Sequence, residues 1–180
     1  MSTPIRLRSV LLLAPALGVA VVLGLAACGA KPAGPVAAGL DTADGARFLA
    51  KNAKAPGVTV LPDGLQYKVV SSGPPGALSP RKGDEIKINY EGTLIDGTVF
   101  DSTYRQGQPA VMGLDGLVPG WMEALPKMHV GDTWFIYLPS KLGYGARGAG
   151  GVIPPNAVLV FKIQLLGVLP AHTPGGVANG

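Results

Sequence analysis

The side chains of this sequence that could do chemistry are mainly aromatic. The candidate set is Tyr90, Phe100, Trp121, Tyr144 and Phe161. Asp101 directly follows Phe100 and could supply the polar partner that a buried Tyr or Trp usually needs. Such a set can line a concave apolar pocket in which a few polar groups orient a ligand. The alternative is that these rings are ordinary core side chains.

Residues suited to nucleophilic or metal chemistry are scarce. The 180 residues include two histidines, His129 and His172, and one cysteine, Cys28. No histidine and carboxylate pair has the usual spacing of metal ligands. We therefore expect neither a metal nor a cofactor, and hydrolase or metalloenzyme chemistry is disfavoured.

A glycine motif, Gly143-x-Gly145-x-x-Gly148, matches the letters of the dinucleotide-binding fingerprint. That fingerprint needs a helix to begin at the motif, so that the helix N-terminus meets the pyrophosphate. The segment 149–155 contains two glycines and two prolines and makes such a helix improbable. A glycine-rich surface loop is the better prediction.

The N-terminus has the order of a secretion signal. Arg6 and Arg8 precede an apolar run over 10–25, which ends in Leu25-Ala26-Ala27-Cys28. This tetrapeptide resembles a bacterial lipobox, in which the cysteine carries lipid. We therefore predict a lipoprotein signal peptide at 1–27, lipidation of Cys28, and a membrane-anchored protein of the cell envelope. An uncleaved membrane helix and a chance cysteine after an ordinary signal are the alternatives.

The charge of the chain gives no sign of a nucleic-acid partner. The formal net charge is +4, and removing Arg6 and Arg8 with the signal leaves 13 − 11 = +2. No run of basic residues remains to follow a phosphate backbone.

Composition divides the rest of the chain. Residues 28–57 are predicted to form a flexible tether with a short helix, in which Phe48 and Leu49 supply the apolar face. A single domain is expected over 58–169, followed by a disordered, Gly/Pro-rich tail at 170–180.

Strands dominate the predicted domain. Apolar and polar residues alternate over 86–91 and 159–165, which predicts two half-buried strands, and 132–138 is a third candidate. Asp96-Gly97 indicates a two-residue hairpin turn. Val118, Trp121, Met122 and Leu125 have helical spacing and predict one apolar helix face. The expected fold is α+β, an antiparallel sheet wrapped around one short helix.

Four motifs in order make the domain similar to a known family. They are Val99-Phe100-Asp101-Ser102, Gly116-Leu117-Val118-Pro119-Gly120-Trp121, Gly143-Tyr144-Gly145 and Ile153-Pro154-Pro155-Asn156-x-x-Leu159-x-Phe161. Together they resemble the FKBP-type peptidyl-prolyl cis–trans isomerases over residues 58–169. Gly64-Leu65-Gln66-Tyr67 resembles the lead-in strand of bacterial members.

The resemblance implies a bent antiparallel sheet around a short helix and a pocket for a proline ring. It makes Trp121 the pocket floor, Asp101 a polar group at its edge, and the Tyr144 hydroxyl and Val118 N–H donors to peptide carbonyls. It makes Tyr90, Phe100 and Phe161 walls, completed by Leu117, Val118, Val152 and Ile153.

Two departures from the family pattern affect this site. Gln106 stands where bacterial members usually have a basic residue, with Arg105 one place earlier, so the pairing of Asp101 with an arginine is in question. Ala110 and Met112 stand where aromatic residues often occur, which implies a thinner wall.

The implied activity is isomerisation of X-Pro bonds in exported polypeptides. The only helix predicted outside the domain, around Arg47 to Lys54, is too short for a substantial dimer seam, so we expect a monomer. A non-catalytic peptide-binding chaperone on the same scaffold is one alternative. A purely structural envelope lipoprotein is another.

Overall fold

The computed structural model describes residues 42–171. The predicted signal at 1–27, the lipidation site Cys28, the first part of the tether and the tail from 172 onward lie outside these residues.

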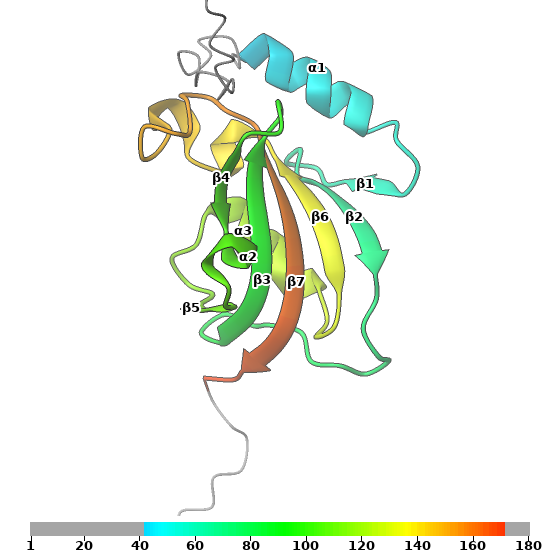
Figure 1. Ribbon diagram of the computed structural model, residues 1–180. Coiled ribbons are helices and arrows are strands. Elements are labelled where there is room, and N and C mark those ends of the chain that lie inside the picture. Colours follow the sequence, from blue (N-terminus) through cyan, green and yellow to red (C-terminus); the bar gives the residue numbers. More distant parts are fainter. Residues whose placement is uncertain (1–41, 172–180) are drawn as a thin grey trace, which may run out of the picture. The chain divides into compact units, whose positions relative to one another are not determined.

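One antiparallel sheet organises the chain (Figure 1). Its strands lie in the order β1-β2-β6-β7-β3-β4. β5 also pairs with β3, on the edge of β3 that faces away from β7 and that β4 shares. Their bounds are β1 Val58–Val60, β2 Gln66–Ser71, β3 Glu85–Leu94, β4 Val99–Ser102, β5 Ala110–Gly113, β6 Thr133–Leu138 and β7 Leu159–Leu169. The helices are α1 Thr42–Asn52, α2 Thr103–Gln106 and α3 Pro119–Ala124, with 3-10 turns at Leu125–Lys127, Ser140–Leu142 and Gly145–Arg147. This α+β architecture confirms the predicted fold class.

The centre of the sheet follows from period-two alternation. β3 pairs with β7 along its whole length, from Glu85 opposite Leu169 to Leu94 opposite Leu159. Inward positions such as Ile88 and Ile163 are fully buried, while outward positions of both strands are polar or partly exposed. The alternation in the sequence therefore predicted these strands and their buried faces correctly.

The turn between β3 and β4 differs from the predicted two-residue turn. Leu94 N–H donates to the Thr98 carbonyl at 2.9 Å, so that Ile95, Asp96 and Gly97 form a three-residue loop. Gly97 alone of these has a positive φ, +86°, and the Asp96 carboxylate accepts from Thr98 N–H at 2.8 Å. A three-residue loop of this kind needs one left-handed residue, which Gly97 supplies, whereas a two-residue turn of type I′ would need two.

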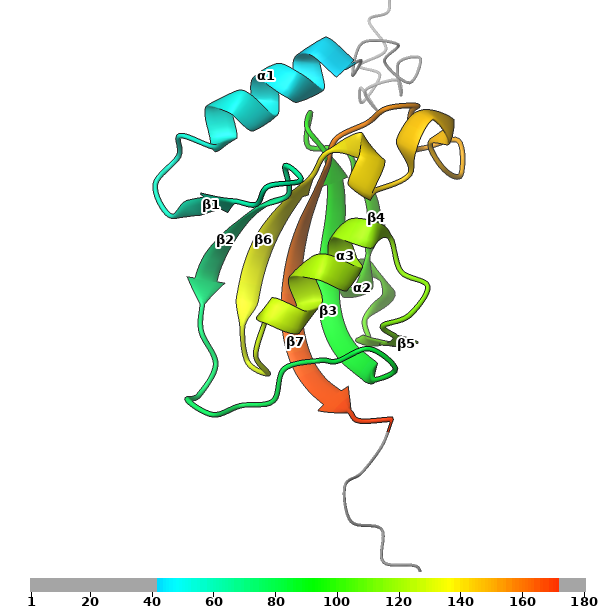
Figure 2. The ribbon, with the colours of Figure 1, turned by 180° about the vertical axis from the view of Figure 1, so that it is seen from behind.

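The short helix α3 crosses the inner face of the sheet (Figure 2). Gly120 permits a close approach, because a Cβ there would meet Leu138 of β6 at 1.6 Å. Trp121 and Leu125 are buried against the sheet, as the spacing predicted. Met122 is 40% exposed, so its place on the buried face was a wrong prediction. The helix has only six residues, and its buried side is limited to Gly120, Trp121 and Ala124.

Helix α1 is joined to the sheet by specific contacts. The buried Gln66 amide donates to the Leu49 carbonyl at 3.0 Å and accepts from Asn52 at 2.8 Å. The Phe48 ring lies 6.1 Å from the Tyr137 ring of β6. The helix predicted within the tether is therefore present, and its C-terminal half is bonded to β2.

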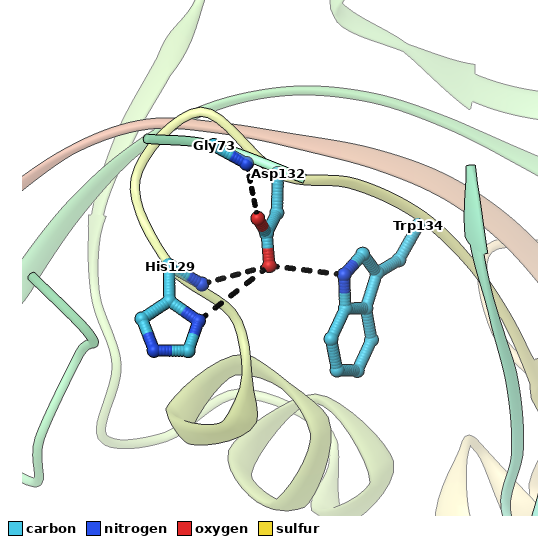
Figure 3. A network of polar contacts seen from close by, with 4 residues as sticks. All are labelled: Gly73, His129, Asp132 and Trp134. Atoms are coloured by element: carbon cyan, nitrogen blue, oxygen red, sulfur yellow. Dashed lines mark hydrogen bonds and ion pairs between the residues drawn. The ribbon is translucent and has the colours of Figure 1, made fainter. Parts of the chain in front are cut away.

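Asp132 ties the long segment 72–84 to β6 (Figure 3). Its buried carboxylate accepts hydrogen bonds from Gly73 N–H at 2.7 Å, His129 N–H at 3.0 Å and the Trp134 indole N–H at 3.1 Å. A Cβ on Gly73 would lie 2.1 Å from the Val130 carbonyl oxygen, so only glycine allows this approach. The network fixes the segment that leads into β3.

Candidate functional site

A cavity of about 280 Å³ lies between the sheet and α3. Strands β3, β4, β5 and β7 supply side chains to it, and so do α3, the loop before it and the loop after β6. The lining residues are Tyr90, Phe100, Asp101, Met112, Gly116, Leu117, Val118, Trp121, Tyr144 and Phe161.

The aromatic walls are packed edge to face. The Trp121 ring lies 5.0 Å from Phe161 and 5.2 Å from Tyr90, at interplanar angles of 82° and 86°. The Phe100 ring lies 5.5 Å from Phe161 at 88°. Edge-to-face pairs are the preferred aromatic geometry and add to the stabilisation that burial gives. The rings therefore form a continuous wall whose shape is fixed by mutual contact.

Gly92 of β3 makes room for this wall. It lies opposite Asp101 of β4 and Phe161 of β7 in the sheet register. A Cβ at this position would lie 2.6 Å from the Phe100 ring and 2.8 Å from the Phe161 ring. Gly92 was not predicted as a site residue, because a lone glycine inside a strand pattern does not by itself show what approaches it.

Asp101 is held by two neutral donors. The Tyr90 hydroxyl donates to one carboxylate oxygen, and the Gln106 amide donates to the other at 3.3 Å. Burial, together with the hydrogen bond to Asp101, raises the pKa of Tyr90 well above its ordinary value. The Tyr90 hydroxyl therefore stays protonated and keeps the carboxylate in place. Thr103, which begins α2, accepts from Tyr90 N–H at 2.9 Å and fastens this end of β4 to β3.

Three donors at the cavity lack acceptors within the described residues. The buried Trp121 indole N–H has no hydrogen-bond partner. The Val118 N–H and the Tyr144 hydroxyl make no hydrogen bond among residues 42–171, and Tyr144 is 41% exposed. Buried N–H groups are rarely left unpaired. A bound molecule with carbonyl oxygens could satisfy such donors.

The structure brings most of the predicted site residues together. Tyr90, Phe100, Asp101, Leu117, Val118, Trp121, Tyr144 and Phe161 all line the cavity. Two others do not. Val152 is half exposed on the loop after Gly150 and Gly151, both of which have positive φ, and Ile153 is buried with its N–H bonded to Ala149. Placing Val152 and Ile153 in the lining therefore differs from the structure.

Two further lining residues stood outside the predicted set of site residues: Met112, which the family pattern had placed only in a thinner wall, and Gly116. Met112 comes from β5, whose pairing with β3 was not anticipated, and Gly116 precedes the predicted Leu117. Ala110, at the other end of β5, is not part of the lining. The sequence signal for Met112 was its position in the family pattern, where an aromatic side chain often occurs.

No histidine is among the residues that line this cavity. His129 belongs to the Asp132 network and lines a different hollow, together with Trp134. Within residues 42–171 no three His, Cys, Asp or Glu side chains gather as metal ligands would. None of the helices in this part of the chain has the length and apolar content needed to cross a membrane.

The comparison with known families decides the relationship. The sequence model described as FKBP-type peptidyl-prolyl cis-trans isomerase matches residues 76–166, and the domain amino terminal to such isomerases matches residues 36–69. The chain belongs to the FKBP-type peptidyl-prolyl cis–trans isomerase family. The FKBP-type match includes β3 to β6 and most of β7, so it contains every residue that lines the cavity.

Individual FKBP-type relatives are similar over most of the chain. The outer membrane protein MIP of Legionella longbeachae is 50% identical over 131 residues, 73% of this chain and 55% of that protein. The peptidyl-prolyl cis-trans isomerase Mip of Coxiella burnetii is 51% identical over 121 residues, 67% of this chain and 52% of that protein. The crystal structure of FkpA from Escherichia coli matches with a TM-score of 0.69 at 42% identity, covering 72% of this chain and 60% of that one. The chain spans about half the length of these two curated FKBP-type relatives.

Proposed function

We propose that this chain is a peptidyl-prolyl cis–trans isomerase that acts on proline-containing polypeptides at the cavity between the sheet and α3. Membership of the FKBP-type family supports the reaction. The observation that carries the proposal is the contiguous set of aromatic rings beside a single carboxylate, together with donors that have no acceptor within the described residues.

The reaction suits an apolar site without a nucleophile. Rotation about an amide bond faces a barrier of about 18–20 kcal/mol because the C–N bond has partial double-bond character. Uncatalysed X-Pro bonds interconvert over tens to hundreds of seconds. Transfer of the amide from water to an apolar cavity disfavours its planar, charge-separated form relative to the twisted one. Interactions that are stronger in the twisted state then accelerate rotation.

Each residue of the cavity has its own role in the proposed reaction. In the proposal Trp121 forms the floor under the proline ring, and Tyr90, Phe100 and Phe161 exclude water from its sides. The Val118 N–H and the Tyr144 hydroxyl donate to peptide carbonyls. Asp101, oriented by Tyr90, acts on the twisting amide as a polar group at the cavity edge.

An isomerisation assay with the full chain in detergent micelles tests the proposal. We expect the rate of cis–trans interconversion of a prolyl tetrapeptide to rise linearly with protein concentration. Phe100→Ala should lower kcat/KM by more than about tenfold, because it opens the wall to water. Phe135→Ala is the matched control, since Phe135 of β6 does not line the cavity and should keep kcat/KM within about twofold of wild type.

Other outcomes would favour the rival functions. Peptide binding without acceleration of isomerisation would indicate a non-catalytic chaperone on the same scaffold. Absence of both binding and acceleration would leave a structural envelope protein.

We further propose that the protein works in the cell envelope, anchored through lipid on Cys28. One relative bears the name outer membrane protein, and Leu25-Ala26-Ala27-Cys28 resembles a lipobox. Stable attachment ordinarily needs more than one acyl chain. Cys28→Ser should therefore move the protein from the membrane fraction to the soluble fraction or leave it unprocessed. Maturation and membrane partition equal to wild type would contradict the anchor.

We also propose that the protein is a monomer once its lipid is removed. Helix α1 is short and contacts the sheet of its own chain through Phe48 and Leu49. Sedimentation of the delipidated protein as a dimer at micromolar concentration would contradict this.

A further inference from the structure

Asp101 is the one charged side chain among the residues that line the cavity. Its two hydrogen-bond donors, the Tyr90 hydroxyl and the Gln106 amide, carry no charge. The ion pairs within residues 42–171 join Arg47 to Asp44 and His129 to Asp132, so none of them includes Asp101. The carboxylate is therefore oriented but not neutralised.

Arg105, the nearest basic residue along the chain, does not pair with Asp101. Arg105 directly precedes Gln106 on the one-turn helix α2, is exposed, and makes no ion pair within the described residues. The helix ends at Gly107, whose φ of +74° closes the turn just after Gln106. The side chain that reaches the Asp101 carboxylate from this turn is therefore the neutral Gln106 amide, and not the Arg105 guanidinium.

The aromatic wall adds to the negative character of the cavity. The faces of aromatic rings attract cations through their quadrupoles. Trp121 and Tyr90 lie at the cavity together with Asp101, and the partly exposed Tyr144 ring stands at its rim. A cationic group entering here would meet a carboxylate and aromatic rings, and no basic side chain of the lining would oppose it.

We propose that this cavity selects prolyl segments in which a lysine or arginine stands directly beside the proline, and that Gln106 determines this selectivity by leaving Asp101 uncompensated. The inference rests on the proposed isomerase function. It assigns a substrate class to the site, and Gln106 acts through Asp101 rather than on the amide.

Tetrapeptides that differ only in the residue directly before or after the proline test the substrate class. With the full chain in uncharged detergent, kcat/KM for the lysine peptide should exceed that for the glutamate peptide by roughly three- to tenfold in one of the two positions, as expected for a partly solvated charge pair. A glutamine peptide should fall between them. Raising the salt from about 0.02 M to about 0.5 M should shrink the lysine-to-glutamate ratio toward one, because salt screens exposed charges.

Two arginine substitutions test the role of Gln106. Gln106→Arg places a cation beside Asp101 and should abolish or reverse the lysine preference. Gln108→Arg adds the same charge at an exposed position two residues away that has no contact with Asp101, and should keep at least half of the preference. The comparison uses the ratio of two substrates on one protein, so a general loss of activity does not affect it.

The outcomes separate this inference from the proposed function. Isomerisation of lysine, glutamine and glutamate peptides at equal rates would overturn the selectivity and leave the isomerase function standing. Equal loss of the preference in both arginine variants would overturn the role of Gln106. If no peptide is isomerised, the proposed function fails and the inference falls with it. The lysine-to-glutamate ratio of kcat/KM in the wild-type protein, and its salt dependence, need no variant. They therefore test the substrate selectivity even if Gln106→Arg does not fold.

Discussion

Tyr90 and Asp101 act as a unit at the edge of the cavity. The hydroxyl of Tyr90 donates to the carboxylate, and the pKa of Tyr90 is raised chiefly by burial and then by this hydrogen bond. The second carboxylate oxygen receives only the longer contact from Gln106. At the scale of single residues, we propose that the site acts through polarity and position rather than through proton transfer.

Removing single polar groups from the cavity should slow isomerisation without abolishing it. Asp101→Ala removes the carboxylate, and Tyr144→Phe removes one hydroxyl that has no acceptor among the described residues. Each should lower kcat/KM by about three- to thirtyfold, because each removes one of several contributors to the twisted-amide site. Peptide assays with circular dichroism as a folding control measure this. Complete loss of activity in a folded Asp101→Ala would indicate a general acid–base enzyme.

The raised pKa of Tyr90 predicts a pH dependence of stability. A group whose pKa is higher in the folded than in the unfolded state stabilises the fold at pH values below its unfolded-state pKa. This contribution is lost as the pH rises through the folded-state pKa. The free energy of unfolding should therefore fall as pH rises above about 10, the ordinary tyrosine pKa. In Tyr90→Phe the fall should be shallower, although the pKa values of Tyr104 and Tyr137 are also raised by burial. Urea unfolding at pH 8, 9.5 and 10.5 checks this, and identical slopes in both proteins would refute it.

Strand β3 is the element that assembles the site. It pairs with β4, β5 and β7, and its inward positions carry Tyr90 and Gly92 toward the rings contributed by its neighbours. The period-two pattern predicted the strand, and the motif order predicted most of the lining. The three-residue turn at 95–97 was missed because Asp-Gly suits both a two-residue turn and a three-residue loop that ends in one left-handed glycine, here Gly97.

Gly92→Ala should distort the aromatic wall. The added methyl would meet Phe100 at 2.6 Å and Phe161 at 2.8 Å, distances at which the rings must move. We expect the free energy of unfolding to fall by about 1–3 kcal/mol, as for overpacked cores, and kcat/KM to fall by more than about fivefold.

Gly113→Ala is the matched control on β5, where an added Cβ meets nothing within 4 Å. It should leave both the free energy of unfolding and kcat/KM near wild type. Equal effects of the two substitutions would show that the wall does not depend on Gly92.

At the scale of the whole domain, buried polar groups join segments that are distant in sequence. Asp132 gathers Gly73, His129 and Trp134 (Figure 3). Gln66 joins β2 to α1. Pairings of this kind could not be predicted from the sequence, since Asp132 read as the ordinary start of a strand. The placement of β7 between β3 and β6, and the exclusion of Val152 from the cavity, likewise depend on long-range packing.

Asp132→Ala should destabilise the domain as a whole. It leaves three N–H donors without their acceptor, and an unsatisfied buried donor costs about 1–3 kcal/mol. We expect a loss of about 2–4 kcal/mol in the free energy of unfolding. Asp132→Asn keeps one acceptor oxygen and should lose less. Thermal and urea unfolding of the two variants compare them, and a loss below about 1 kcal/mol in Asp132→Ala would contradict the structural role.

The central claim is that isomerisation takes place in the aromatic cavity, and the two tryptophans differ in their relation to it: Trp121 lines the cavity, whereas Trp134 lies outside it. The Trp121 indole N–H is unpaired at the cavity, whereas the Trp134 indole N–H is bonded to Asp132. NMR of tryptophan-labelled protein with a prolyl tetrapeptide follows both indole signals and the cis–trans exchange of the peptide in one sample. The account predicts exchange cross-peaks together with a shift of the Trp121 signal, while the Trp134 signal stays in place. Exchange cross-peaks without any change at Trp121 would contradict it.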